Sequence, residues 1–181
     1  MKAKEEYVQL REELMYWTKA RINLITSVLI IIPAIIGWVV ANPEFFSWMI
    51  ASMIPLLVIA LSSQLTRLFA ENTIVIAGYL RYYCKSNYED KLYNLKYDQT
   101  RKALNFSIAW YYFALTLISI VIPYLVCNEN SRIDQSLECI LFALILLFNL
   151  FSIFQLVVMN LHRLRKKYYE KWKETDKKED I

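Results

Sequence analysis

The sequence contains almost no glycine and almost no histidine. Only two glycines, Gly37 and Gly78, and one histidine, His162, occur in 181 residues. The glycine-rich turns that bind phosphates and the nucleophile elbow of serine hydrolases are absent. A single histidine gives no His-Glu-x-x-His motif and no Cys/His spacing typical of a zinc site. We predict that the protein is not an enzyme and needs no metal or cofactor.

Charge is missing from four long stretches of the chain. Each is close to or longer than the roughly 20 residues that a helix needs to cross about 30 Å of hydrocarbon. No Asp, Glu, Lys or Arg lies inside them, which argues against an ion-coupled transporter. We predict an all-α integral membrane protein with a single membrane domain over residues 1–181. The predicted spans are 22–42, 45–66, 103–127 and 139–161.

Lysine and arginine are distributed unevenly among the segments that join these spans. Five precede the first span, seven lie between the second and the third, and eight follow the fourth. The two remaining loops contain a single basic residue, Arg132. Because positive charge accumulates on the cytoplasmic side of membrane proteins, we expect both termini and residues 67–102 to be cytoplasmic.

The segments predicted to be cytoplasmic have helical character. We predict an amphipathic helix over residues 1–21, which either lies on the membrane and its neighbours or binds a partner. Residues 67–102 are predicted to form a protruding helical hairpin that breaks near Ser86 and Asn87, and residues 162–181 form a basic tail. The apolar residues of the first helix recur at three- and four-residue steps: Tyr7, Leu10, Leu14 and Trp17.

The fourth span carries a stripe of polar side chains. Amides at mid-membrane are costly unless they face a partner helix or water. Two interpretations stay open, which are hydrogen bonds between helices and the lining of a pore. The candidate pore-lining residues are Asn149, Ser152, Gln155 and Asn160.

The hairpin and the tail interleave bases with aromatic residues. Cations beside stacking rings bind nucleotides and single-stranded nucleic acid, although lipid head groups attract the same residues. The candidate residues for an anionic ligand are Arg81, Lys85, Lys91, Lys96, Arg101, Lys102, Arg163, Arg165, Lys166 and Lys167.

Two cysteines, Cys127 and Cys139, lie at the ends of two antiparallel spans, on the side predicted to be outside. In an oxidising periplasm they are candidates for a disulfide that closes the short outer loop. Cys84, by contrast, is predicted to be cytoplasmic and free.

One local motif and the order of the spans suggest a family. The basic-aromatic stretch from Tyr16 to Arg21 leads directly into a span that contains Pro33, and a very short outer turn, a second span and a long cytoplasmic helix follow. This arrangement resembles the SMODS-associated four-transmembrane effectors and their two-transmembrane SLATT relatives. The resemblance implies a pore-forming protein of a bacterial conflict system, often encoded beside a nucleotidyltransferase that makes a nucleotide signal.

We therefore expect a homo-oligomeric ion channel in the inner membrane of a bacterium, acting in anti-phage defence. Four spans are too few to enclose a wide pore, so several copies surround an axis, with a tetramer favoured. An anionic nucleotide or oligonucleotide at the basic cytoplasmic face would gate it. The alternative is a non-conducting scaffold or sensor that binds a soluble partner through its hairpin and tail. A third hypothesis is a protein that binds anionic lipids of the bilayer through the same bases.

Overall fold

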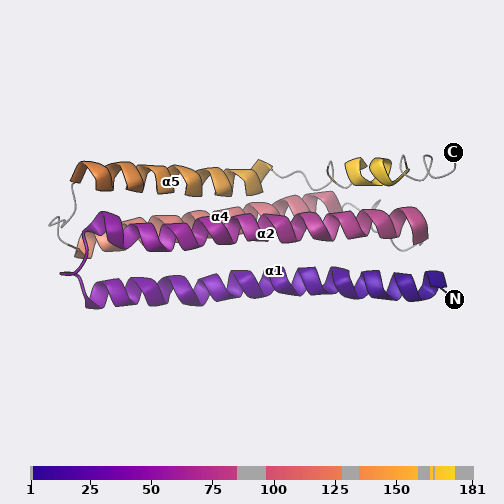
Figure 1. The fold of residues 1–181 in the computed structure, drawn as a ribbon, viewed down its shortest axis with the longest axis horizontal. Helices are drawn as coiled ribbons and strands as arrows, with labels where there is room; N and C mark the ends of the chain where they lie inside the picture. The colour runs from indigo at the N-terminus through magenta and orange to yellow at the C-terminus, as the bar shows by residue number, and fades with distance from the viewer. Residues whose placement is uncertain (1, 85–96, 128–134, 159–163, 165, 174–181) are drawn as a thin grey trace. The chain divides into compact units, whose positions relative to one another are not determined.

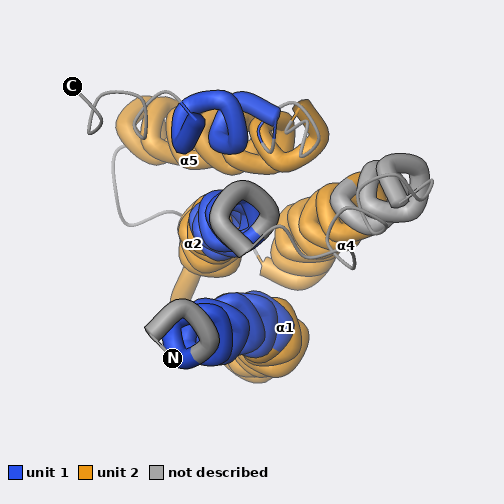
Figure 2. Tube along the Cα trace, turned by 90° about the vertical axis from the view of Figure 1, so that its right-hand side faces the viewer, with its two compact units in different colours: residues 1–22, 67–105, 159–181 blue, residues 23–66, 106–158 orange. Residues whose placement is uncertain are grey.

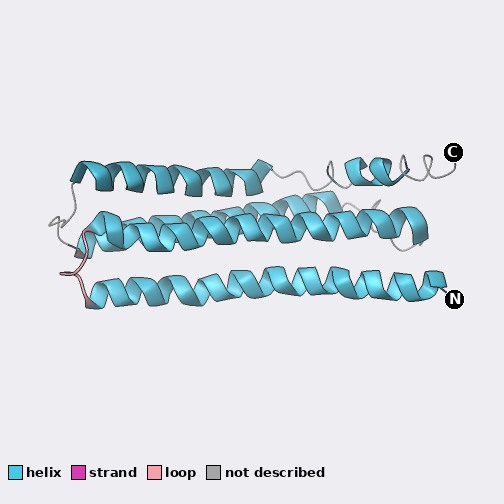
Figure 3. Ribbon diagram, viewed as in Figure 1, coloured by secondary structure: helices cyan, strands magenta, loops and turns pink. Residues whose placement is uncertain are grey.

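The computed structural model describes residues 2–84, 97–127, 135–158, 164 and 166–173, with side chains except at 2–4, 81–84 and 97–105. Within these ranges nearly every residue is helical (Figures 1 and 3). A short helical segment follows over 166–173. The long helices are α1 (Lys2–Ala41), α2 (Trp48–Cys84), α4 (Tyr97–Val126) and α5 (Gln135–Val158).

Four of these helices are long and apolar enough to cross a membrane, as the uncharged runs predicted. The helix is the form in which a single chain segment satisfies all its backbone polar groups in lipid. The qualifying segments are Glu5–Ala41, Trp48–Leu80, Phe106–Val126 and Gln135–Val158.

The ends of the helices differ from the predicted spans. The amphipathic segment 1–21 and the span 22–42 form one continuous helix, α1. Helix α2 begins at Trp48 and continues to Cys84, so Gly78 does not interrupt it. Helix α5 begins at Gln135, four residues before the expected start. The expected break at residues 86–87 lies outside the described residues.

The contacts divide the chain into two compact units, coloured in Figure 2. Unit 1 contains residues 1–22, 67–105 and 159–181, and unit 2 contains residues 23–66 and 106–158. We expected a single membrane domain over the whole chain. Unit 1 is built from three stretches of sequence and unit 2 from two, because α1, α2 and α4 each contribute residues to both units.

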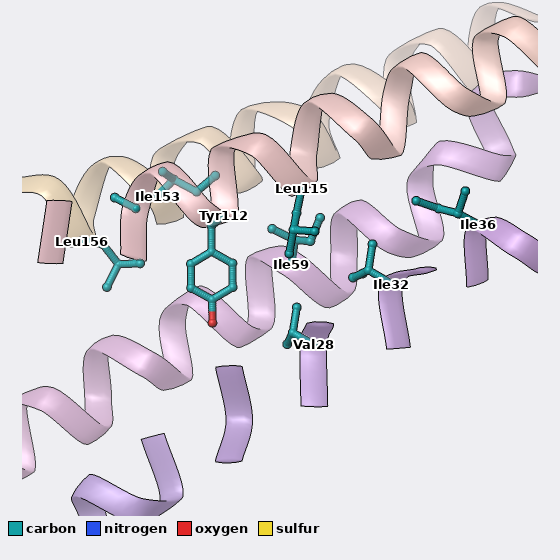
Figure 4. Packing of buried hydrophobic residues seen from close by; sticks show 9 residues of the cluster. Val28, Ile32, Ile36, Ile59, Tyr112, Leu115, Ile153 and Leu156 are labelled. Carbon is teal, nitrogen blue, oxygen red and sulfur yellow. The ribbon is translucent and has the colours of Figure 1, made fainter. Parts of the chain in front are cut away.

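The core of unit 2 takes side chains from all four helices (Figure 4). Helix α1 contributes Val28, Ile32 and Ile36, which are spaced one turn apart and therefore lie on one face. Helix α2 contributes Ile59, and the ring of Tyr112 reaches from α4 toward α2. The remaining core members are Ala109, Leu115, Ile153 and Leu156.

The connection between α1 and α2 is tight, in agreement with the very short outer turn that the sequence predicts. Asn42 N–H donates to Val39 O (3.1 Å) and Phe45 N–H donates to Asn42 O (3.3 Å). Ser47 then caps α2, because its Oγ accepts the N–H of Ile50 at 3.3 Å. The cap explains why α2 begins at Trp48.

Unit 1 contains the N-terminal part of α1, the far part of α2 and the segment 166–173. The four apolar residues predicted for the inner face of the first helix are half-buried. Trp17 of α1 packs against Phe69 of α2, with ring centroids 5.5 Å apart. Tyr79 of α2 donates a hydrogen bond to Glu6 at 2.7 Å, and its ring lies edge-on to Trp172. These contacts join three distant stretches of sequence.

Candidate functional site

A ladder of hydrogen-bonded polar side chains runs through the interior of unit 2, and we call it the polar ladder. Asn149 is its central member and is fully buried. Its Nδ2 donates to the carbonyl of Leu56 on α2 at 2.9 Å, and its Oδ1 accepts the hydroxyl of Thr116 on α4 at 3.0 Å. One amide therefore connects three helices.

The next level of the polar ladder joins α2 to α5. Gln64 Nε2 donates to Ser152 Oγ at 3.0 Å and to Gln155 Oε1 at 3.1 Å. Ser152 in turn donates to the carbonyl of Phe148, one turn earlier in α5. Since Gln64, Ser152 and Gln155 satisfy one another, these polar groups are accommodated within a single protomer.

A third level of the polar ladder joins α2 to α4. The hydroxyl of Tyr112 lies 2.8 Å from Thr66 Oγ1, and it also donates to the carbonyl of Ser62 at 3.4 Å. Both Thr66 and Tyr112 are fully buried. A tyrosine that is buried in this way contributes a large apolar body and anchors its polar end to a fixed partner.

The polar ladder ends at a buried carboxyl group that sequence analysis missed. Glu138 lies in the first turn of α5 and is only 1% exposed. Its Oε1 accepts the hydroxyl of Ser47 at 2.9 Å. Its Oε2 has no hydrogen-bond partner among the described residues. The predicted fourth span, 139–161, leaves Glu138 in the outer loop, because a charge at the edge of an apolar run normally marks the end of a span.

Two buried serines lie on the helices of the polar ladder without joining it. Ser52 on α2 donates to the carbonyl of Trp48 in its own helix at 2.8 Å. Ser119 on α4 lies one turn beyond Thr116 and is fully buried, and its Oγ has no hydrogen-bond partner in the part of the chain that the structure describes. Ser119 is therefore a polar group whose hydrogen-bonding capacity is unused within the described part of unit 2.

The structure brings together three of the four predicted pore-lining residues. Asn149 and Ser152 point into unit 2 and Gln155 is half-buried, whereas Asn160 lies outside the described residues. The outer face of α5 carries apolar side chains instead, including Leu147, Phe151 and Phe154. The bonds that Asn149, Ser152 and Gln155 make to α2 and α4 are those that the first interpretation, hydrogen bonding between helices, requires.

The residues predicted to bind an anionic ligand are mostly beyond what the structure describes. Lys166 and Lys167 are described and exposed, and Lys166 Nζ lies 3.9 Å from Glu170 one turn later. An exposed pair at this distance contributes little to stability. The side chains outside the described set are those of Arg81, Lys85, Lys91, Lys96, Arg101, Lys102, Arg163 and Arg165.

The two cysteines that are candidates for a disulfide, Cys127 and Cys139, are free in the structure. Cys139 Sγ lies 3.7 Å from the thioether of Met49. Cys127 is buried against Val39 and Ala51 instead. Burial raises the pKa of the Cys127 thiol. The thiols therefore contact different parts of unit 2, and the side chain of Cys84 lies outside the described set.

The division into units coincides with the distribution of charge. Unit 1 contains 20 of the 21 lysines and arginines and 13 of the 17 acidic residues, and unit 2 contains Arg132 and four acids. The division rests on packing and takes no account of charge. Two independent properties therefore separate the chain at nearly the same residues.

Comparison with known proteins adds no relative: the chain matches no family model, no curated protein and no solved structure.

Proposed function

We propose that the protein is a homo-oligomeric ion channel of a bacterial inner membrane, and that unit 2 is its closed form. The observation that supports this proposal is the polar ladder. It extends along most of α5, from Glu138 to Gln155, and takes partners from α2 and α4. Polar groups are expensive inside a bilayer, and they concentrate along ion and water pathways.

The closed state follows from the way in which the polar ladder is satisfied. Asn149 and Gln155 bond to groups of the same protomer, and the outer face of α5 is apolar. A conducting path therefore requires α5 to move so that these groups exchange their partners for water. Hydrogen bonds between membrane helices contribute about 0.6 kcal/mol each on average, so a ligand can supply enough energy to break several of them.

The distribution of charge supports a cytoplasmic position for both termini and for residues 67–102, which would form the protruding hairpin. Twenty bases of one protomer would then lie on one side of the membrane, and a tetramer would multiply this charge around one axis. An anionic nucleotide or oligonucleotide fits such a surface. In this proposal a partner nucleotidyltransferase makes the ligand during phage infection, and the open channel dissipates the membrane potential.

Recording in planar bilayers tests the channel directly. Purified protein is inserted, and short oligonucleotides are added to the side that carries the termini. We expect discrete conductance steps whose open probability changes with the oligonucleotide. Protein that is inserted and oligomeric but silent in every ligand state would overturn the proposal.

A non-conducting scaffold or sensor is the second candidate function. The observation that favours it is that both polar atoms of the Asn149 amide find a hydrogen-bond partner within one protomer, because such bonds need no pore to explain them. Replacement of Asn149 and Gln155 together by leucine separates the two functions. A scaffold loses stability and has no conductance to change, whereas a channel changes its conductance. The control is Leu147→Val with Phe154→Leu, on the outer face of the same helix.

A further inference from the structure

Glu138 is a carboxyl group within a helix that is long and apolar enough to cross a membrane. It is buried and accepts one hydrogen bond from the hydroxyl of Ser47, which reaches Oε1 at 2.9 Å. A carboxylate can accept several hydrogen bonds, yet Oε2 has no partner among the described residues. Ionisable groups inside a membrane are costly and are concentrated along the paths of ions. The unused oxygen of Glu138 therefore calls for a functional explanation.

Glu138 lies on the same face of α5 as Asn149, the central member of the polar ladder. Eleven residues separate the two positions, which is close to three turns of an α-helix, so they differ by about 20° around the helix axis. They are about 16 Å apart along that axis. Ser152 and Leu156 continue the same face, and all four side chains are buried. The polar face of α5 therefore begins with a carboxyl group and continues with uncharged groups.

A movement of α5 that exposes Asn149 to water also exposes Glu138. The helix contains no proline and no glycine, the residues at which helices most often kink. The two side chains therefore turn together when α5 rotates. Such a rotation separates Glu138 from Ser47 on the α2 side and leaves both carboxyl oxygens without that donor. The carboxyl group is then available to an ion in the path.

The fixed charge of unit 2 is negative. Its sequence contains four acidic residues and one basic residue, Arg132, which lies outside the described residues. Glu138 is the buried acid among the described residues of unit 2, and the other buried polar side chains of this unit are hydroxyls and an amide without charge. Unit 1, by contrast, has more bases than acids. The two units therefore favour ions of opposite sign, and the charge that lines the narrow path decides which ions pass.

We propose that the channel is selective for cations and that Glu138 is the residue that selects them. The inference rests on the proposed function, because it requires a conducting pore. In a tetramer, four copies of Glu138 lie at one level around the symmetry axis. A ring of carboxylates attracts cations and repels anions, most strongly where walls of low dielectric focus the field.

The reversal potential of the current in a gradient of KCl measures this selectivity. Purified full-length protein is inserted into planar bilayers and opened by the oligonucleotide. We expect K⁺ to permeate at least about tenfold better than Cl⁻. A channel that prefers Cl⁻, as the basic unit 1 alone would favour, overturns the inference. A channel that does not distinguish the two ions also overturns it.

Glu138→Gln tests the assigned residue, because it removes the charge and keeps an oxygen for the hydroxyl of Ser47. We expect the preference for K⁺ to fall to below about twofold. The matched control is Glu44→Gln, which removes the same charge from an exposed position in the turn before α2. Salt screens exposed charges, so this variant should keep the preference of the parent. Equal loss in both variants, or no loss in Glu138→Gln, would show that Glu138 does not select the ion.

A second measurement changes the charge on the assembled channel and so does not depend on how a variant folds. Cys139 is exposed and follows Glu138 directly in α5. In a chain that retains only this cysteine, one methanethiosulfonate reagent adds a positive group and another adds a negative group. We expect the positive group to lower the permeability of K⁺ relative to Cl⁻ and the negative group to raise it. The same change with both reagents, or no change with either, contradicts the inference.

Failure of the inference can be distinguished from failure of the proposed function. Protein that is inserted and oligomeric but silent in every ligand state overturns both. A conducting protein whose ion preference is absent, reversed or independent of Glu138 overturns only the inference, and the channel remains.

Discussion

Asn149 joins α5 to both α2 and α4 in the interior of unit 2. Its side chain bonds both to the backbone of α2 and to a hydroxyl of α4. An apolar side chain at the same position can fill the same volume in many rotations of the helix. An amide with two fixed partners permits only one rotation of the helix, so Asn149 determines the rotation of α5 about its own axis.

Ser47 has two roles at the end of the polar ladder, and their energies can be separated. Its Oγ caps α2 and donates to Glu138. We expect Ser47→Ala to lower the free energy of unfolding by about 2 kcal/mol, with about 1 from the cap and the rest from a buried carboxyl that loses its partner. The measurement is unfolding in mixed detergent micelles followed by circular dichroism.

A double-mutant cycle with Glu138→Gln tests the second role of Ser47. The glutamine keeps an oxygen for Ser47 and carries no charge, so we expect it alone to be neutral or stabilising. In its presence the cost of Ser47→Ala should fall from about 2 toward about 1 kcal/mol, because a neutral amide that loses its hydrogen-bond partner costs less than a carboxylate does. The control is Ser52→Ala, a buried serine that bonds only within its own helix. Purely additive energies would show that the bond from Ser47 is no stronger to a carboxylate than to an amide.

The two described thiols should differ in reactivity. In single-cysteine chains we expect a maleimide to label Cys139, which is exposed, faster than Cys127, which is buried. The thiolate is the reactive form. Because burial raises the pKa of Cys127, its labelling rate should keep rising above pH 9, the usual pKa of a thiol. Equal rates for both positions at pH 7 would contradict the described burial.

Sequence alone could predict which residues of α5 are polar and that three of them share one side. It could not predict their partners. Whether Asn149 faces Leu56 and Thr116 or an axis between protomers depends on how four helices are rotated against one another, and residue spacing within α5 does not contain that information. Glu138 was missed for another reason. Charge was used to define the ends of spans, so a buried charge at an end could not be recognised.

At the scale of whole helices, Gly78 marks where the segment 166–173 approaches α2. A β-carbon built on Gly78 would lie 3.6 Å from Tyr168 Cβ, an ordinary contact distance. We expect Gly78→Ala to be tolerated, with a gain of up to about 1 kcal/mol from helix propensity. Gly78→Phe should instead displace the segment, because no space remains for a ring.

Limited proteolysis of the C-terminal segment measures this displacement. Cleavage near residues 166–173 should be faster in Gly78→Phe than in the parent chain. The chain supplies a matched control at its only other glycine, because nothing lies within 4 Å of a β-carbon on Gly37. Gly37→Phe should leave cleavage unchanged. Similar cleavage of both variants and the parent would show that the segment does not depend on Gly78.

The helices themselves were largely predictable, because run length and the absence of charge are strong signals for membrane spans. The residues at which the helices begin and end were less predictable. The predicted second span began at residue 45, whereas the helix begins at Trp48 after the Ser47 cap. The continuity of α1 from Lys2 to Ala41 was also unexpected, since the change from amphipathic to apolar composition near residue 21 suggested two elements. Composition changes there, but no residue breaks the helix.

At the scale of the whole molecule, the coincidence of charge and packing leads to a test of topology. We expect a fluorescent protein fused after residue 181 to fold and fluoresce, because the C-terminus is proposed to be cytoplasmic. Alkaline phosphatase fused within residues 128–134 should be active, because it requires export. A non-fluorescent C-terminal fusion together with an inactive phosphatase fusion would reverse the proposed orientation.

Unit 1 is assembled from three stretches of sequence, and one of them follows all four long helices along the chain. The segment 166–173 supplies Tyr168 against Gly78 and Trp172 against Tyr79. Ribosomes add about 5 to 20 residues per second, so α1 and α2 wait several seconds for this partner. Unit 1 therefore cannot be completed until residues 166–173 have been made. A nascent chain that stalls before residue 166 would contain all four long helices but an incomplete unit 1, which quality-control proteases could recognise.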